Sequence, residues 1–100
     1  MWKAGIKVVM KIWLDDLRVA PEGYETVKSV NEAIELIEKC EKNNEPIEVL
    51  DLDHDLGDYA YDGGDAIKLL DYIAEMETFY PVEIHTANPV GRENMYRMLD

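Results

Sequence analysis

The feature that most constrains the fold is the alternation of short strand-like segments with longer amphipathic segments. Ile6 to Leu14 alternates in a period of two, which predicts a strand that ends at Asp15-Asp16. Ser29 and Glu32 then have the form of a capping box that opens a helix. The same patterns predict further strands at 24–28, 47–52 and 82–86, helices at 30–42, 66–74 and 93–99, a loop at 53–64 and a turn at 88–91.

This order of elements restricts the fold class and the number of domains. Strands separated by helices are parallel and joined by right-handed crossovers, so we expect an α/β fold. A chain of 100 residues makes one domain. Its formal net charge of −12 argues against a broad basic surface for nucleic acid or anionic lipid. The single cysteine, Cys40, excludes an internal disulfide, and without a signal peptide or a long apolar run we expect a cytoplasmic protein.

Acidic residues follow two of the predicted strands. Asp15 and Asp16 come after the first strand, and Asp53 and Asp55 after the third. Ligands of open parallel sheets bind at the carboxyl ends of the strands, and converging carboxylates need a cation to offset their repulsion. We therefore expect these four residues to hold Mg²⁺ or Mn²⁺. The alternative is that acids of this kind are solvated loop caps, the interpretation that we favour for Asp58, Asp62 and Asp65.

The two histidines and a group of polar residues near the C-terminus are further candidates. His54 follows the third strand and His85 the fourth, so both are expected at one sheet edge, where they suit acid–base chemistry on a phosphoester. The alternative for each is a histidine that only holds a loop by hydrogen bonds. Thr86, Asn88 and Arg92 are candidate phosphate ligands beside a helix N-terminus. For Arg92, pairing with surface acids is the alternative.

Several motifs resemble the receiver domains of two-component signalling. They are Leu14-Asp15-Asp16, Leu52-Asp53, Asp62-Gly63 and Thr86-Ala87. The resemblance implies an acid pair and an aspartate that hold Mg²⁺, with Asp53 as phosphoryl acceptor and Thr86 as the hydroxyl that senses it. The sequence differs from receivers in two respects. Residues 17–23 leave almost no room for the first helix of a receiver. Receivers also carry an essential lysine on a fifth strand, whereas the last lysine here is Lys68, before the fourth strand.

Longer motifs resemble a more compact family, the cyclic-phosphate-processing receiver domains. They are Trp13-Leu14-Asp15-Asp16-Leu17-Arg18, Leu52-Asp53-His54-Asp55-Leu56-Gly57 and His85-Thr86-Ala87-Asn88-Pro89-Val90-Gly91. The resemblance implies a truncated flavodoxin-like, three-layer α/β fold with a four-stranded, mostly parallel sheet of order 2-1-3-4 and three helices. The domain would span residues 10–100, and residues 1–9 would extend its first strand.

The resemblance implies a function in processing a cyclic phosphate on a nucleotide or an RNA end. On this interpretation the chain is a metal-dependent phosphoesterase in which Asp53, His54 and His85 are catalytic. Asp53 would act as a metal ligand or as the nucleophile. The alternative is a non-catalytic receiver-like module without the receiver lysine, which binds a second copy or a partner protein through the fourth-strand edge.

Overall fold

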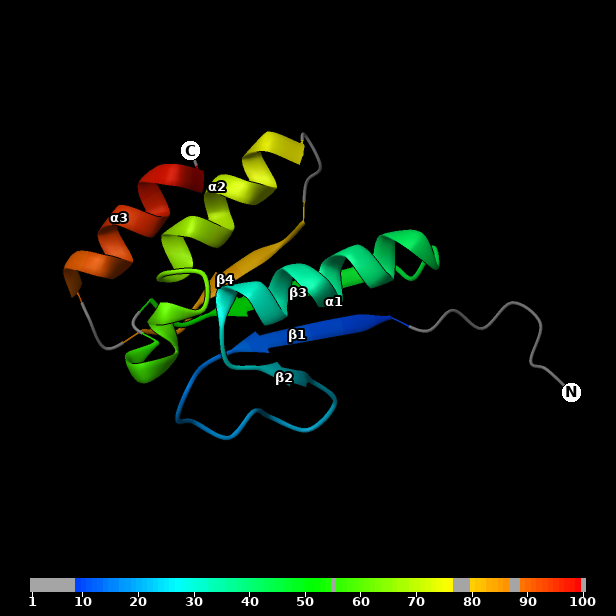
Figure 1. Cartoon of the computed structure of the whole chain (residues 1–100), viewed down its shortest axis with the longest axis horizontal. Helices are drawn as coiled ribbons and strands as arrows, with labels where there is room; N and C mark the ends of the chain where they lie inside the picture. Colours follow the sequence, from blue (N-terminus) through cyan, green and yellow to red (C-terminus); the bar gives the residue numbers. More distant parts are fainter. Residues whose placement is uncertain (1–8, 55, 77–79, 87–88, 100) are drawn as a thin grey trace, which may run out of the picture.

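The architecture is a parallel sheet with helices packed on one side (Figure 1). A computed structural model describes residues 9–54, 56–76, 80–86 and 89–99. In chain order the elements are β1 (Met10–Leu14), β2 (Glu25–Val27), α1 (Val30–Lys42), β3 (Ile47–Leu52), the 3₁₀ helix η1 (Gly57–Tyr61), α2 (Ala66–Met76), β4 (Val82–Ile84) and α3 (Pro89–Leu99). No helix in these ranges is long and apolar enough to cross a membrane.

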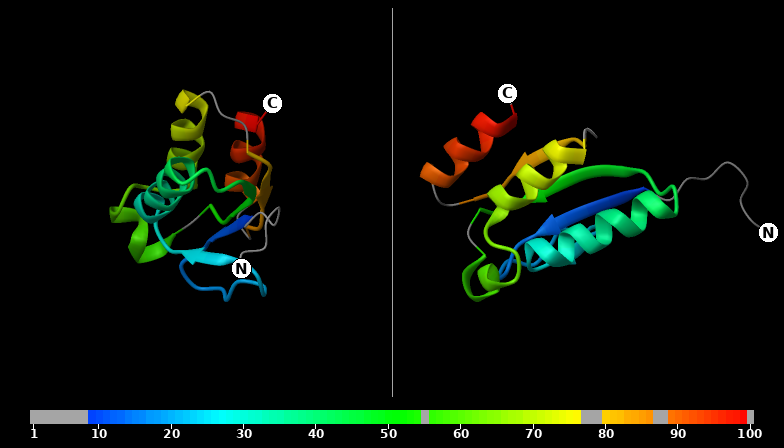
Figure 2. Two further views of the ribbon diagram at one scale, coloured as in Figure 1. Left: turned by 90° about the vertical axis from the view of Figure 1, so that its right-hand side faces the viewer. Right: turned by 45° about the horizontal axis from the view of Figure 1, so that its top comes forward.

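The sheet has the predicted strand order, β2-β1-β3-β4, with all neighbours parallel. The α/β class, the strand order and the three α-helices are therefore confirmed, but the layering differs from the expected three layers. In Figure 2 the described helices cover one face of the sheet, and α3 lies beside α2 near β4. Right-handed crossovers place α1 and α2 on that face. A helix between β1 and β2 would cover the other face, and residues 15–24 form none.

The alternation of side chains along the central strands separates the core from the open face. Ile12 and Leu14 of β1 and Leu50 and Leu52 of β3 are fully buried and pack against the helices. The residues between them, Trp13 and Asp51 among them, point to the opposite face. Burying the apolar set at about 25 cal/mol per Å² is the main force that holds the helices on the sheet.

The ends of α1 follow from local chemistry that the sequence predicts. The Ser29 hydroxyl accepts a hydrogen bond from the Glu32 N–H, and the Glu32 carboxylate accepts one from the Lys28 N–H. These bonds satisfy N–H groups at the helix start that have no intrahelical partner. At the other end, Asn44 adopts a positive φ of 57°, a conformation that asparagine tolerates and that stops the helix.

The C-terminal third departs from the predicted boundaries. The turn predicted at 88–91 is wrong for Pro89 to Gly91, because α3 begins at Pro89 instead of Glu93. Proline is well suited to the first position of a helix, where its missing N–H costs nothing. Gly91 has a packing role, since a Cβ there would lie 2.5 Å from the ring of His54. The first strand begins at Met10. Of its predicted extension through residues 1–9, Val9 is not in the strand, and residues 1–8 lie outside the described residues.

Candidate functional site

Three aspartates come together at the carboxyl end of the sheet. Leu14 pairs with Leu52 in the parallel register of β1 and β3, so the residues that follow these two strands lie side by side. Asp15, Asp16 and Asp53 each offer a carboxylate oxygen, and these oxygens lie within 4.8 Å of one another. Parallel pairing thus gathers carboxylates that are almost forty residues apart in the sequence.

Asp15 is buried and held by several hydrogen bonds. Its Oδ1 accepts the backbone N–H groups of Leu17 and Arg18, at 2.8 and 3.0 Å. Its Oδ2 lies 3.0 Å from Nε2 of His85. Burial alone would raise the pKa of Asp15, but the two backbone N–H groups and the His85 ring outweigh burial, and the pKa is lowered. Asp15 is therefore an oriented, ionised acid.

The Asp16 carboxylate lies so close to Gly57 that any side chain at position 57 would force the carboxylate to shift. A Cβ on Gly57 would be only 2.5 Å from the Asp16 Oδ2 atom, and Gly57 has a φ of +54°. Both its conformation and the close approach of the carboxylate favour glycine at this position. The first turn of η1 therefore forms one wall beside the half-buried Asp16.

Asp53 is joined to the end of β4 through Thr86. Its backbone N–H donates to the Leu14 carbonyl at 2.9 Å, which ties it to β1, and its carboxylate accepts a hydrogen bond from the buried Thr86 side chain. Burial raises the pKa of Asp53, and the nearby Asp15 charge adds to this, whereas the bond to Thr86 opposes it. The net rise indicates that the negative charge of Asp53 is only partly compensated by protein groups.

His85 lies between two carboxylates on the open face of the sheet. Nε2 faces Asp15, and Nδ1 makes a short contact with Oδ1 of Asp51. The ring stacks on Trp13, with centroids 3.7 Å apart and planes 8° from parallel. Each ring nitrogen of His85 therefore has one carboxylate partner. This geometry suits a residue that fixes Asp15 in place.

The role of Asp51 was missed from the sequence. Asp51 is not among the candidate residues identified from the sequence, yet it is buried in β3 and binds His85. The spacing of Asp51 and Asp53 could have indicated this role. Asp51 lies in the third strand and Asp53 directly follows it, and residues two apart share one face of a strand. The residue opposite Asp51 in the register of β1 is Trp13, which explains how one imidazole contacts both.

His54 lies at the same sheet edge but has different neighbours. Its ring packs against Gly91 in the first turn of α3, and its Nε2 is 3.7 Å from the Asp65 carboxylate. Asp65 also caps α2, because its Oδ1 accepts the Ile67 N–H at 3.0 Å. His54 thus contacts the starts of two helices, whereas His85 contacts the open face of the sheet.

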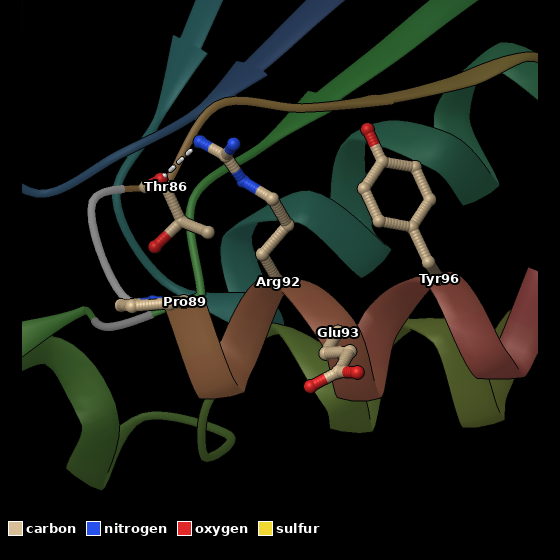
Figure 3. Close-up of a pocket in the computed structure, with 5 residues that line it drawn as sticks. All are labelled: Thr86, Pro89, Arg92, Glu93 and Tyr96. Carbon is tan, nitrogen blue, oxygen red and sulfur yellow. Dashed lines mark hydrogen bonds between the residues drawn. The ribbon is translucent and has the colours of Figure 1, made fainter.

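Two of the candidate phosphate ligands, Thr86 and Arg92, border a pocket of about 330 Å³ between α3 and the end of β4 (Figure 3). It is lined by Thr86, Pro89, Arg92, Glu93 and Tyr96. Arg92 Nη2 donates to the Thr86 carbonyl at 2.6 Å, and within the described ranges Arg92 has no ion pair with a surface acid. Asp55, Asn88 and the side chain of Asp58 lie outside the described residues.

The acid cluster fits a hard divalent cation in its donor set. Carboxylate oxygens are the protein ligands that Mg²⁺ and Mn²⁺ prefer, and such sites usually keep several waters. Both oxygens of Asp15 already accept hydrogen bonds, while the Asp16 carboxylate has no hydrogen bond or ion pair within the described residues. Asp16 and Asp53 would therefore be the more available ligands, with Asp15 as the third.

Comparisons with known proteins give one result. The family model described as "Cyclic-phosphate processing Receiver domain" matches residues 10–100. No curated protein and no solved structure matches the chain. The match covers β1 to α3 and includes each of the acids described above.

Proposed function

Because the chain belongs to the family of cyclic-phosphate processing receiver domains, we propose that it opens a cyclic phosphate on a nucleotide or an RNA end with the help of a divalent cation. The cation would be held by Asp15, Asp16 and Asp53, whose oxygens already converge. This convergence is the observation that carries the proposal. When bound, Mg²⁺ or Mn²⁺ would offset the negative charge of the cluster and polarise a phosphoryl oxygen.

The proposed reaction is the hydrolysis of one P–O bond of the ring. Water forms a new bond to phosphorus, one of the two ring P–O bonds breaks, and the proton that water loses ends on the released hydroxyl. We assign the proton transfers to His54, which follows Asp53 directly and whose Nε2 lies near the Asp65 carboxylate. His85 is assigned a positioning role, because its two ring nitrogens already face Asp15 and Asp51.

The phosphate itself would be bound at the end of β4. Thr86 is hydrogen-bonded to Asp53 and also lines the pocket, so it lies at the boundary between the acids and the pocket. The bond to the Thr86 carbonyl uses one of the five N–H groups of Arg92, which leaves others for a phosphate oxygen. Asn88 is assigned to the phosphate and Asp55 to the cation on sequence grounds alone.

The experiment that tests the proposal is a substrate screen with purified protein. The probes are 2′,3′-cyclic nucleotides, cyclic dinucleotides and RNA oligonucleotides that end in a 2′,3′-cyclic phosphate, each with Mg²⁺, with Mn²⁺ and with EDTA. We expect ring opening of at least one class in the metal-containing samples and none in EDTA. No opening of any probe with either metal would contradict the proposal.

One observation favours a second, non-catalytic function. Within the described residues β4 pairs only with β3, so one edge of this strand has no strand neighbour. Such an edge can pair with another chain. A module that binds a second copy or another protein through β4 would give no turnover in the screen. It would show a second species by light scattering or a partner-dependent change in the NMR signals of Val82 to Ile84.

A further inference from the structure

The pocket beside α3 has a feature that phosphate binding does not use. Arg92 and Tyr96 are four residues apart, so they lie on one face of α3, one turn from each other. Figure 3 shows both side chains directed to the same side of the helix, whereas Glu93 points away from them. The Tyr96 residue is 50% exposed, which leaves its side chain open to a ligand in the pocket.

The order of the groups defines a direction. Asp53 is bonded to Thr86, Thr86 accepts from Arg92 through its carbonyl, and Tyr96 follows Arg92 along α3. If the phosphate of a ligand lies at Asp53 and Thr86, the rest of the ligand would therefore extend past Arg92 towards Tyr96. The pocket volume of about 330 Å³ is at the lower end of the range for small-ligand sites, about 300–1,000 Å³.

We propose that Tyr96 is a specificity-determining residue that stacks on the base of a single nucleoside whose cyclic phosphate lies at Thr86 and Asp53. This inference rests on the proposed function and deepens it, because it names the substrate class as nucleoside cyclic phosphates and not cyclic phosphates in general. Stacking on an aromatic ring is tolerant of base identity, since every base has a π face. The site would therefore favour a substrate that carries a base, without choosing strongly among the four bases.

The test compares two probes that share a five-membered cyclic phosphate. Adenosine 2′,3′-cyclic phosphate carries a base, and glycerol 1,2-cyclic phosphate does not. KM and kcat are measured with Mg²⁺ for the wild type and for Tyr96→Ala, Tyr96→Phe and Met98→Ala. Met98 is an exposed residue of the same helix that does not line the pocket, so its variant is the matched control. If a protein shows no turnover, its affinity is measured by calorimetric titration of each probe.

We expect Tyr96→Ala to raise KM for the adenosine probe about 5- to 150-fold, the range for loss of one base–aromatic stack, with kcat little changed. Tyr96→Phe keeps the ring and should stay within about twofold of the wild type. KM for the glycerol probe should be the same in the wild type and in all three variants. Met98→Ala should match the wild type with both probes.

The contradicting outcomes separate the two proposals. If the wild type opens both probes and Tyr96→Ala changes neither KM, the inference is overturned and the proposed function stands. If the adenosine probe binds in a Tyr96-dependent way but is not opened, the pocket assignment is supported and the hydrolytic function is contradicted. If neither probe binds nor reacts, the inference is contradicted, and the cyclic dinucleotides and RNA ends of the screen above decide the proposed function.

Discussion

At the scale of single residues, the arrangement around His85 determines how the acid cluster is built. The His85 ring, which follows β4, lies between the carboxylates of Asp15 after β1 and Asp51 in β3, and it stacks on Trp13. Buried charges are stable only when they are paired and hydrogen-bonded. The imidazole pairs with two acids on the open sheet face, where the described residues include no helix.

Asp51→Asn is expected to destabilise the fold although Asp51 is assigned neither to the cation nor to the phosphate in the proposed mechanism. The substitution removes one negative partner of His85 and should lower the free energy of unfolding by about 1–3 kcal/mol, the usual cost of disrupting a buried charged hydrogen bond. Urea denaturation measures this. Asp71→Asn, on the exposed surface of α2, is the matched control. Equal unfolding midpoints for the two variants would show that Asp51 does not hold His85.

At the scale of elements, the segment after β3 is joined to the start of α1 by Asp62. Its carboxylate accepts hydrogen bonds from the Ser29 hydroxyl at 2.7 Å and from the Asn31 amide at 3.0 Å. Gly63 approaches Asn31 so closely that a Cβ would lie 2.8 Å from its Oδ1. The Asp62-Gly63 pair is therefore a structural connection between a loop and a helix cap, which is more specific than the solvated cap that we expected.

This connection predicts a pH dependence of stability. The hydrogen bonds from Ser29 and Asn31 lower the pKa of Asp62 below its ordinary value of 3.8. A group whose pKa is lower in the folded state contributes stability above its unfolded pKa and loses it as the pH falls through the folded pKa. Asp62→Asn should thus be less stable than the wild type at pH 7, and the difference should shrink below about pH 4. Thermal unfolding from pH 7 to pH 2.5 measures it, and a difference that stays constant with pH would be contrary to this account.

The elements were more predictable than the contacts between them. The bounds of β3 and the cap of α1 follow from local patterns, which a sequence displays directly. The approach of Asp15, Asp16 and Asp53 was also predictable, because parallel strands bring their carboxyl ends together. The partner of Asp51 was not, since a strand pattern tells which face a side chain shares but not which residue it meets across the sheet. For the same reason Gly91 was interpreted as a turn residue, although His54 packs against it.

At the scale of the whole molecule, the net charge of −12 divides into a dispersed part and a clustered part. Glu32, Glu35, Glu38 and Glu41 lie on an amphipathic helix whose opposite side packs on the core. The three aspartates at the sheet edge are different, because their oxygens converge and burial disfavours the charge of Asp53. A cation at this edge would relieve the repulsion among these three carboxylates.

Mg²⁺ is therefore expected to stabilise the fold through the acid cluster. At a concentration one hundred times its Kd, the ion should add about 2.7 kcal/mol to the free energy of unfolding of the wild type. Asp53→Asn should be more stable than the wild type without Mg²⁺, because it removes a disfavoured charge, and should gain less when Mg²⁺ is added. Differential scanning fluorimetry over a Mg²⁺ series measures both effects, with Asp71→Asn as control. The same gain in Asp53→Asn and in the wild type would place the bound ion elsewhere.

We propose that the acid cluster at the ends of β1 and β3 opens a cyclic phosphate. ³¹P NMR of adenosine 2′,3′-cyclic phosphate tests it most directly, because ring opening replaces the signal of the cyclic diester with that of a monoester. With Mg²⁺, the wild type and Asp71→Asn should convert the substrate at equal rates. Asp53→Asn should be slower by at least about 100-fold, as when one electrostatic group of an active site is removed. Conversion by Asp53→Asn at the wild-type rate would contradict the account.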